Sequence, residues 1–376
     1  MTPSTPQLVV HDDAIRANTR AFVGRTDGRL MAVLKADGFG HGAIARSVVG
    51  SGAGSIGVAT IDEALAVRAG VSDVPVLSWL NAVDADLDAA LLADVDLAVS
   101  GHELLNAVSR AAARTRRRAR LHLQVDVGMA RDGAAPETWP ALCSAARELE
   151  AHGTVRVVGV MGHMSCADRP ADPQNARERL LFANAVRTAR RRGLAGFVTH
   201  LAATAATITG VGGHHDLHRI GAGLFGIDPS GTSTDLQPTL SLTAPVVGTR
   251  AIGVGAGIGY GLDHVADRRT NLALLPLGYG DGLPDRPRNV PRCTCAAVDA
   301  GSSGGSRWTW WSSTRATTSS KLGETVSLFG RGRDGEPTIH DWAGWADTIE
   351  HEIVTRIGVR AARIHRTTTA PEAFVA

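Results

Sequence analysis

Short apolar runs alternate with longer segments of helical periodicity from residue 12 to about residue 235. Eight runs are suited to one strand each: Met31–Lys35, Ser55–Ala59, Pro75–Trp79, Leu97–Ser100, Leu121–Asp126, Val157–Gly162, Phe197–His200 and Leu217–Ile220. Apolar residues are spaced as in a helix at Asp12–Val23, Glu63–Ala69, His102–Arg114, Pro140–Ala151 and Gln174–Arg191. These alternations favour a closed (β/α)8 TIM barrel over residues 12–235. An open doubly wound sheet is the alternative, because the helix after the eighth strand has the weakest pattern.

The pattern changes after residue 236. From Thr239 to Ile252, runs of Leu, Val, Thr and Ile alternate with turn residues, and helical segments become scarce beyond them. This predicts a mostly β C-terminal domain over residues 236–376. The N-terminal residues 1–11 precede the first helix, and we expect them to pack on this second domain.

The composition points to an enzyme-sized protein of the cytoplasm. A length of 376 residues is enough for two domains, and 39 basic against 37 acidic residues give a net charge of only +2. We therefore expect no nucleic-acid partner. No apolar run approaches membrane-spanning length and no signal-peptide pattern opens the chain, so we expect no membrane partner. Four cysteines form no disulfide framework in a chain this long, and Cys293 with Cys295 lacks a second ligand pair for a metal.

The strongest candidate for chemistry is Lys35, which ends the first predicted strand. It follows the apolar run Leu30–Leu34, and three glycines come within the next seven residues. A lysine at the end of a buried strand is partly desolvated, which lowers the pKa of its amine and makes the amine nucleophilic near neutral pH. The glycines let the backbone turn sharply and approach a bound group closely. The stretch predicts a Schiff-base lysine, although a surface lysine on an ordinary turn explains it equally well by itself.

Other polar residues follow the ends of further predicted strands. Arg131 follows the fifth strand, His163 ends the sixth, His200 and Thr204 follow the seventh, and Arg219 lies on the eighth. Barrel enzymes place their sites at the carboxyl ends of the strands. Polar groups from five strands are therefore expected to converge on one rim.

The segment Gly221–Gly226 has the spacing G-x-G-x-x-G, which alone is weak support for a dinucleotide because no clear βαβ unit follows. Free backbone N–H groups after the last strands of a barrel nevertheless bind anions such as phosphate. A lysine amine and a phosphate site on one rim suggest pyridoxal 5'-phosphate as the cofactor.

Together these motifs resemble the alanine racemase family of fold-type III pyridoxal phosphate enzymes. The resemblance covers nearly the whole chain and rests on six segments in the expected order: Ala32–Gly42, Asp126–Arg131, Gly162–Met164, His200–Ala206, Arg219–Gly221 and Gly259–Gly261. It implies an N-terminal barrel, a C-terminal β domain, and a homodimer in which the partner chain completes each site. The implied reaction interconverts L-alanine and D-alanine through a pyridoxal aldimine and supplies D-alanine for peptidoglycan in the cell wall.

The resemblance also implies a role for each matched residue. Lys35 carries the cofactor and acts as one acid/base, and Tyr260 of the partner subunit acts as the other from the opposite face of the substrate. Arg219 faces the pyridine nitrogen and leaves it unprotonated, which restrains side reactions such as transamination, and His163 supports Arg219. Arg131 contacts the cofactor's phenolic oxygen and the substrate carboxylate. Thr204 and the backbone of Gly221 and Ala222 hold the phosphate.

Two positions depart from the family pattern. Gln124 replaces a lysine that many members carbamylate to position the arginine equivalent to Arg131, and its amide is expected to hold Arg131 instead. Phe39 replaces a tyrosine that touches the phosphate, and no tyrosine follows Tyr279. A racemase for serine or another small amino acid and an unrelated barrel hydrolase stay open as alternatives. A catalytically impaired cofactor-binding homologue is a further alternative, supported by the missing phenols and by residues 291–320, which look out of frame.

Residues 291–320 read unlike the rest of the chain. Three of the seven tryptophans lie in Trp308–Trp311, a Ser/Thr-rich stretch follows, and no strand or helix period is visible. Trp is encoded by TGG and Thr by ACN, so the frame that starts on the third base forces aspartate across Trp308-Thr309. Permitted codons in that frame give the family's missing Gly-Arg-Ile-Ser-Met-Asp segment. We infer that the interval is frame-shifted; a genuine insertion loop that removes a central strand is the alternative.

This inference is tested by sequencing the gene across the codons for residues 285–325. We expect one continuous frame that encodes Gly-Arg-Ile-Ser-Met-Asp, because the family pattern resumes at Leu322. If the written codons stand, the interval is genuine, and we expect poor folding and weak activity. A high turnover rate from a chain with the written residues would contradict that expectation.

Overall fold

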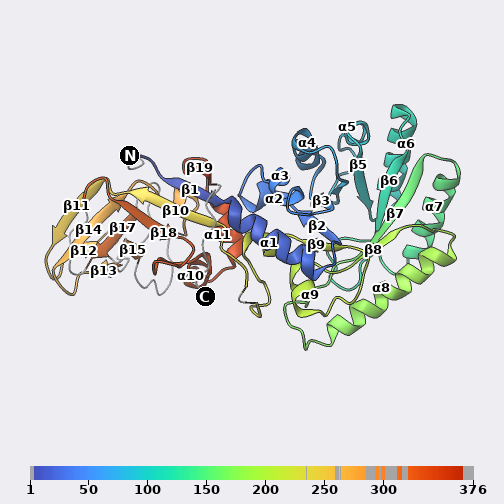
Figure 1. The fold of residues 1–376 in the computed structure, drawn as a ribbon. Helices are drawn as coiled ribbons and strands as arrows, with labels where there is room; N and C mark the ends of the chain where they lie inside the picture. The colour runs from blue at the N-terminus through green and yellow to red at the C-terminus, as the bar shows by residue number, and fades with distance from the viewer. Residues whose placement is uncertain are drawn as a thin grey trace. The chain divides into compact units, whose positions relative to one another are not determined.

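The computed structural model describes residues 4–233, 235–258, 262, 264–284, 293–295, 298–300, 311–315 and 321–366. The chain divides into two compact units, of which one is Arg16–Leu236 and the other joins Met1–Ile15 to Gln237–Ala376 (Figure 1). The expected domain limits, 12–235 and 236–376, stay predictions. No helix in the described part of the chain is long and apolar enough to cross a membrane.

Eight parallel strands form the centre of the unit Arg16–Leu236. They are β2 (Leu30–Val33), β3 (Ser55–Val58), β4 (Val76–Ser78), β5 (Val95–Val99), β6 (Ala119–Gln124), β7 (Val155–Met161), β8 (Val198–His200) and β9 (His218–Ile220). Strands β2 to β8 pair in chain order and β9 pairs with β2. Between β8 and β9 there is only an isolated bridge, from Ala203 to Arg219, so the barrel is nearly closed. The predicted barrel is confirmed.

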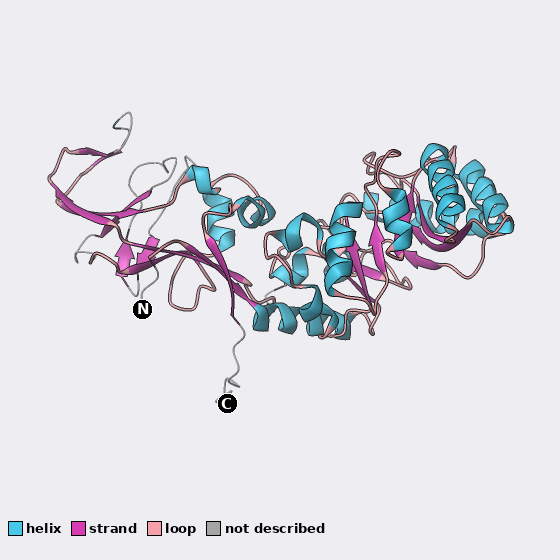
Figure 2. Cartoon of the chain, turned by 90° about the horizontal axis from the view of Figure 1, so that it is seen from above, coloured by secondary structure: helices cyan, strands magenta, loops and turns pink. Residues whose placement is uncertain are grey.

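Helices accompany the strands of this unit, drawn cyan beside the magenta strands in Figure 2. They are α1 (Asp12–Arg25), α2 (Lys35–Phe39), α3 (Ala45–Val49), α4 (Ile61–Gly70), α5 (Leu87–Leu92), α6 (His102–Thr115), α7 (Trp139–Ala151), α8 (Gln174–Arg191) and α9 (Thr204–Thr209). The five helices that periodicity predicts correspond to α1, α4, α6, α7 and α8. Helix α4 begins where it does because Thr60 and Glu63 form a capping box at its N-terminus.

The segment after β9 forms only a short 3-10 helix, η1 (Ala222–Phe225), where the weakest of the predicted helices was expected. Helix α1 packs against it instead. Asn18 donates its side-chain amide to the carbonyl oxygen of Leu224 at 3.2 Å. A Cβ on Gly223 would lie 2.4 Å from the ring of Phe22, so glycine lets the two elements approach closely. Residues before the first barrel strand thus cover the place of an eighth helix.

Apolar side chains fill part of the barrel interior. Met31, Leu77, Ala98 and Met161 form a buried cluster, against which Trp79 packs. Since these residues come from β2, β4, β5 and β7, the cluster joins strands all around the barrel. The barrel is therefore a packed core, and reactive groups are left for the strand ends.

The second unit is mostly β, as predicted. One sheet has the order β18 (Thr325–Phe329), β10 (Leu240–Pro245), β1 (Gln7–His11), β19 (Ala362–Arg366), and another has the order β11 (Gly248–Ile252), β14 (Thr270–Leu275), β17 (Trp311–Arg315). Two strand pairs, β12 (Gly257–Ile258) with β13 (His264–Val265) and β15 (Cys293–Cys295) with β16 (Val298–Ala300), and the helices η3 (Tyr279–Asp281), α10 (Ile339–Trp345) and α11 (Glu350–Arg356) complete it. Trp342 of α10 is buried and donates its indole N–H to the Leu328 carbonyl oxygen at 2.6 Å.

The expectation that residues 291–320, as written, lack strands is wrong for part of the interval. Strands β15, β16 and β17 lie within it, and β17 pairs antiparallel with β14. Backbone hydrogen bonds form a strand without an apolar period, and Thr and Trp both favour extended backbone. The frame-shift inference itself stays a prediction, and the rest of the interval lies outside the described residues.

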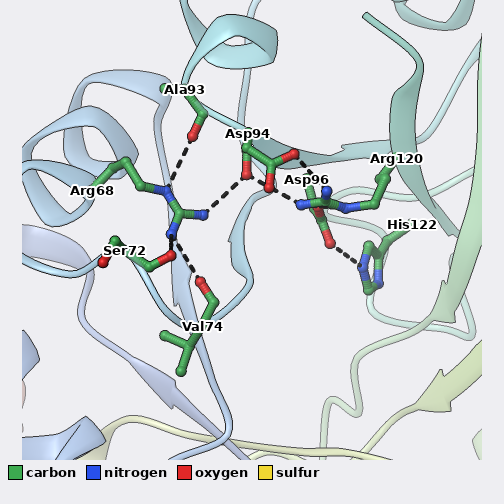
Figure 3. Close-up of polar contacts among 8 residues, drawn as sticks. All are labelled: Arg68, Ser72, Val74, Ala93, Asp94, Asp96, Arg120 and His122. Atoms are coloured by element: carbon green, nitrogen blue, oxygen red, sulfur yellow. Dashed lines mark hydrogen bonds and ion pairs between the residues drawn. The ribbon is translucent and has the colours of Figure 1, made fainter.

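Arg68 of α4 ties the loops around β4 and β5 together (Figure 3). Its guanidinium donates to five backbone carbonyl oxygens at 2.9–3.3 Å: those of Val71, Ser72, Val74, Ala93 and Asp94. One side chain thus satisfies carbonyls that belong to two successive loops.

Replacing Arg68 with methionine keeps the aliphatic stem but removes all five hydrogen bonds. We expect a loss of about 2 kcal/mol or more in the free energy of unfolding, because hydrogen bonds to charged groups are strong and the carbonyls lose their partner. Arg114→Met is the matched control, since Arg114 pairs with Asp88 at 2.6 Å on the exposed surface and this variant should lose much less stability than Arg68→Met. Calorimetric melting of both variants checks this, and equal melting temperatures would contradict it.

Candidate active site

The backbone after β2 takes an unusual conformation at Lys35. The amide of Leu34 still bonds to the carbonyl oxygen of Gly57, which continues the parallel ladder by one residue. Ala36, Asp37, Gly38 and Phe39 then all have φ between 54° and 59°, so α2 contains a left-handed turn. Each non-glycine residue in this region costs about 1–2 kcal/mol. A costly turn directly after a candidate nucleophile fits a functional constraint.

Two side chains hold this turn. Glu63 of α4 accepts from the amides of Ala36 at 2.7 Å and Ala59 at 2.8 Å, so one carboxylate joins the Lys35 loop to the end of β3. His41 is fully buried, and its Nδ1 lies 2.9 Å from the Gly38 carbonyl oxygen. The backbone that carries Lys35 is therefore held from both sides.

The amine of Lys35 has a lowered pKa. Partial burial is the main cause and the charge of Arg131 adds to it, while Glu63 acts in the opposite direction. Part of the side chain still meets solvent, so the amine remains accessible. The direction of the shift is the one that the sequence predicts, and it raises the fraction of free amine near neutral pH.

Arg219 on β9 is buried and satisfied mostly by backbone. Its guanidinium donates to the carbonyl oxygens of Gly162 at 2.6 Å, His200 at 2.8 Å and Leu201 at 3.2 Å. It also lies 3.1 Å from Nδ1 of His200 and 3.2 Å from Nδ1 of His163. Burial lowers the pKa of Arg219 to about 10, with Arg131 as the second cause, so the group stays cationic at neutral pH.

His163 and His200 are neutral beside this cation. Burial and then the charge of Arg219 lower the pKa of His163 to about 3. Burial, followed by His122 and Arg219, lowers the pKa of His200 well below its ordinary value. Since Arg219 is only a donor, the nitrogens that face it act as acceptors. His163 is therefore in contact with Arg219, and the supporting role that the resemblance implies for it stays a prediction.

Arg131 ends a loop that the carboxylate of Asp126 shapes. This carboxylate accepts from the amides of Gly128 at 2.9 Å, Met129 at 3.0 Å and Ala130 at 3.2 Å. Gly133 has a φ of 117°, and a Cβ there would lie 2.4 Å from the Asp126 amide nitrogen, so the return of the loop requires glycine. Arg131 is exposed, and its charge acts on both Lys35 and Arg219.

Thr204, Gly221 and Ala222 come together between α9 and η1. The hydroxyl of Thr204 accepts from the amides of Gly221 and Gly223, each at 3.3 Å. Amides at the start of a helix have no acceptor within their own helix and suit an anion. A Cβ on Gly221 would lie 2.9 Å from Phe39 Cζ, which brings the end of β9 against the Lys35 loop. An amine, a buried guanidinium and these amides form a donor set that fits pyridoxal 5'-phosphate.

Two further expectations from the sequence concern Gln124 and Tyr260. The prediction that Gln124 holds Arg131 is wrong in this structure, because Oε1 of Gln124 has no hydrogen-bond partner among the described residues. Only this oxygen of the amide could accept from a guanidinium, and it is buried while Arg131 is exposed. Tyr260 lies outside the described residues, so its role stays a prediction.

Sequence reasoning missed three residues that support the site: Glu63, His122 and Asp96. Glu63 shows a capping-box pattern with Thr60 in the sequence, but nothing there indicates its second contact with Ala36. His122 and Asp96 lie within apolar strands and belong to no motif, and only the closed barrel brings them near His200 and Arg219.

A barrel with a lysine after its first strand, a buried arginine on its last strand and a β domain defines the class of fold-type III pyridoxal phosphate enzymes. The family described as alanine racemase, N-terminal domain, matches residues 10–229, and alanine racemase, C-terminal domain, matches residues 239–304 and 309–365. The chain therefore belongs to the alanine racemase family.

Individual relatives agree with this assignment. Alanine racemase of Frankia casuarinae is 39% identical over 363 residues, covering 94% of each chain, and that of Thermobifida fusca is 38% identical over 94% of this chain and 96% of its own. The solved alanine racemase of Streptomyces coelicolor superposes with a TM-score of 0.93 at 36% identity, over 97% of this chain and 98% of that chain.

His163 is expected to make the protein sensitive to acid. Its folded pKa of about 3 lies below the unfolded value of 6.5, so the unfolded chain binds the extra proton between these values and acidification favours unfolding. At pH 5 this group costs about 2 kcal/mol of stability relative to pH 7 or above. His163→Asn should therefore lose less stability than the wild type between pH 7 and pH 5.

Thermal unfolding at the two pH values measures this difference. His102→Asn is the control, because His102 is an exposed histidine at the start of α6 and the variant should follow the wild type. A His163→Asn variant whose melting temperature falls as far as that of the wild type would overturn the prediction.

Proposed function

We propose that this chain interconverts L-alanine and D-alanine with pyridoxal 5'-phosphate by a two-base reaction at the rim of the barrel. The observation that carries the proposal is the amine of Lys35, whose pKa is lowered. Lys35 begins a left-handed turn at the end of β2, and β2 pairs with β9, the strand that carries the buried Arg219. Family membership and curated relatives named alanine racemase over 94% of the chain support alanine as the substrate.

Each part of the cofactor has a candidate partner at this rim. Lys35 would hold it covalently, Thr204 with the backbone of Gly221 and Ala222 would bind its phosphate, and Arg219 would face its ring nitrogen. When bound, the cofactor supplies an electron-withdrawing ring that acidifies the Cα proton of the amino acid. Phe39 packs on Phe225 with ring centroids 4.8 Å apart and offers an apolar wall without a phenol.

Two bases on opposite faces of the substrate would move the Cα proton. Lys35 removes or returns it on one face, and its lowered pKa raises the fraction of amine that is free to accept a proton. Tyr260 is proposed for the other face, supplied by the partner subunit of a homodimer. Inversion at Cα requires that the proton leave from one face and return to the other.

Arg219 and Arg131 would set the electrostatics of the reaction. Arg219 stays cationic despite its burial, and a cation that only donates leaves a ring nitrogen unprotonated. This weakens the ring as an electron sink and should restrain transamination. Arg131 is proposed to bind the substrate carboxylate, since its exposed guanidinium lies close enough to Lys35 for its charge to act on the amine. A cytoplasmic location and a role in peptidoglycan synthesis belong to the same proposal.

Lys35→Ala tests the proposal directly. We expect the variant to lose the visible absorption of bound cofactor and to lose racemisation by about a thousandfold or more, because no other amine replaces the nucleophile. Tyr260→Phe should retain the cofactor absorption but lose about a hundredfold or more in rate, since a general acid/base typically contributes that factor. Arg114→Met is the control for both, because Arg114 lies on the exposed surface of α6.

The measurements are the absorption spectrum and the rate of D-alanine formation from L-alanine. Solvent deuterium should enter Cα in both wild-type directions. A Lys35→Ala variant that keeps both the spectrum and the rate would rule out the proposed role of Lys35. An unchanged rate in Tyr260→Phe would remove Tyr260 as the second base.

A further inference from the structure

Buried polar side chains form a line from Arg219 through the barrel interior to Asp96. Nδ1 of His200 lies 3.1 Å from Arg219, and Nε2 of His200 lies 2.8 Å from Nδ1 of His122. Nε2 of His122 lies 3.4 Å from the Asp96 carboxylate. Asp96, His122 and Arg219 are each 4% exposed and His200 is 0% exposed. The line thus joins β9, β8, β6 and β5 out of contact with bulk water.

The chemistry of its two ends fixes the direction of every proton in this line. Arg219 only donates, so Nδ1 of His200 accepts and the His200 proton lies on Nε2. Nε2 of His200 then donates to Nδ1 of His122, which leaves the His122 proton on Nε2, facing Asp96. A carboxylate only accepts, so the far end agrees with the near end. The donors all point from Arg219 toward Asp96.

Gly159 on β7 makes this line possible. In the parallel pairing of β6 with β7, His122 lies opposite Gly159, and β8 follows on the other side of β7. A Cβ at residue 159 would lie 2.0 Å from Nδ1 of His122. Glycine therefore lets the His122 ring cross the intervening strand and reach His200.

Asp96 is anchored at the outer end of the line (Figure 3). Nε of Arg120 donates to its Oδ1 at 2.5 Å, and Arg120 also pairs with Asp94 at 2.6 Å. Oδ1 of Asp96 is thereby committed to Arg120, and Oδ2 is the atom that faces His122. The orientation of the carboxylate is therefore fixed by Arg120.

We propose that Asp96 and His122 are positioning residues for Arg219, which they orient by fixing the tautomer of His200. This inference rests on the proposed function, in which Arg219 faces the cofactor ring nitrogen. Asp96 sets the proton of His122, His122 sets that of His200, and His200 offers Arg219 an acceptor instead of a competing donor. Both terminal nitrogens of Arg219 are then committed to protein acceptors, and its remaining N–H, on Nε, is left for the cofactor.

Asp96→Asn changes this arrangement at one atom with almost no change in shape. Arg120 requires the amide oxygen, so the amide NH2 faces His122 and donates to it. His122 must then carry its proton on Nδ1, His200 on its own Nδ1, and the latter would oppose Arg219, donor against donor. A single amide thus reverses the direction of the hydrogen bonds between residue 96, His122 and His200. A wrong tautomer imposed by an Asp→Asn change costs about ten-thousandfold in the well-known serine protease triad, and the more distant site here should cost about tenfold to a hundredfold in kcat/KM.

The decisive readouts are properties that loss of packing alone would not move. We expect Asp96→Asn to change the visible absorption of bound cofactor and its pH profile, and to increase transamination, measured as pyruvate released per racemisation. Arg219 and His122 contact His200, and the charge of His215 also acts on it; His163 contacts Arg219, and the charge of Arg131 acts on that residue, so the pH profile reports on this cluster. Asp88→Asn is the matched control, since Asp88 pairs with Arg114 on the exposed surface.

The double variant Asp96→Asn with His122→Asn provides a rescue. The new amide in place of the His122 ring can turn its oxygen toward His200 and no longer transmits the reversal, so the double variant should lie closer to the wild type than Asp96→Asn does. If Asp96→Asn does not fold, His122→Phe replaces it, because phenylalanine leaves Nε2 of His200 without its acceptor and should shift the spectrum in the same way.

The outcomes separate the inference from the proposed function. A wild-type protein that, after incubation with pyridoxal 5'-phosphate, shows neither cofactor absorption nor racemisation would refute the proposed function. A normal wild type together with an Asp96→Asn variant of unchanged spectrum, pH profile and transamination would refute the inference alone. A rate loss in Asp96→Asn with wild-type spectrum and pyruvate release would also refute it, because that pattern belongs to a structural role.

Discussion

The burial of the Arg219 guanidinium is the interaction on which the rest of this site depends. A buried cation is costly unless its donors are satisfied, and here three carbonyl oxygens and two imidazole nitrogens accept from it. The carbonyls belong to the ends of β7 and β8, across the place where β8 and β9 share only an isolated bridge. One side chain therefore adds to the few backbone hydrogen bonds that join the β8 and β9 segments. The cation that is proposed to tune the cofactor also stabilises the place where the barrel is nearly closed.

This arrangement requires that the neighbouring histidines stay neutral. Burial and the charge of Arg219 itself lower the pKa of His163 and of His200, so the cation helps to create the acceptors that it needs. A protonated imidazole would present a donor and a like charge to the guanidinium. The tautomer of each histidine is consequently determined by its neighbours. These tautomers follow from one residue that can only donate and from a carboxylate, Asp96, that can only accept.

The sequence predicts the barrel well because its strands are buried on both faces and read as short apolar runs between helical segments. It predicts the rim residues Lys35, Arg131, His163, Thr204 and Arg219 for a related reason: chemistry in a barrel lies at strand ends, and strand ends are visible in the sequence. It does not predict the left-handed turn at Ala36–Phe39, because Ala and Phe have no local preference for that conformation. Glu63 of α4, His41 just after the turn and backbone hydrogen bonds within the turn stabilise it together.

The same limit explains why the polar line inside the barrel is invisible in the sequence. His122 lies between Leu121 and Leu123 and reads as one polar residue in an apolar run. Its partner His200 is 78 positions away, and the space it crosses exists because residue 159 on the strand between them is glycine. The predicted pairing of Gln124 with Arg131 was wrong although the two residues are close in the sequence. The side-chain oxygen of Gln124 is buried, whereas Arg131 is exposed. Strand position is a local property that the sequence shows, whereas the direction of a hydrogen bond across a barrel is decided by every group along it.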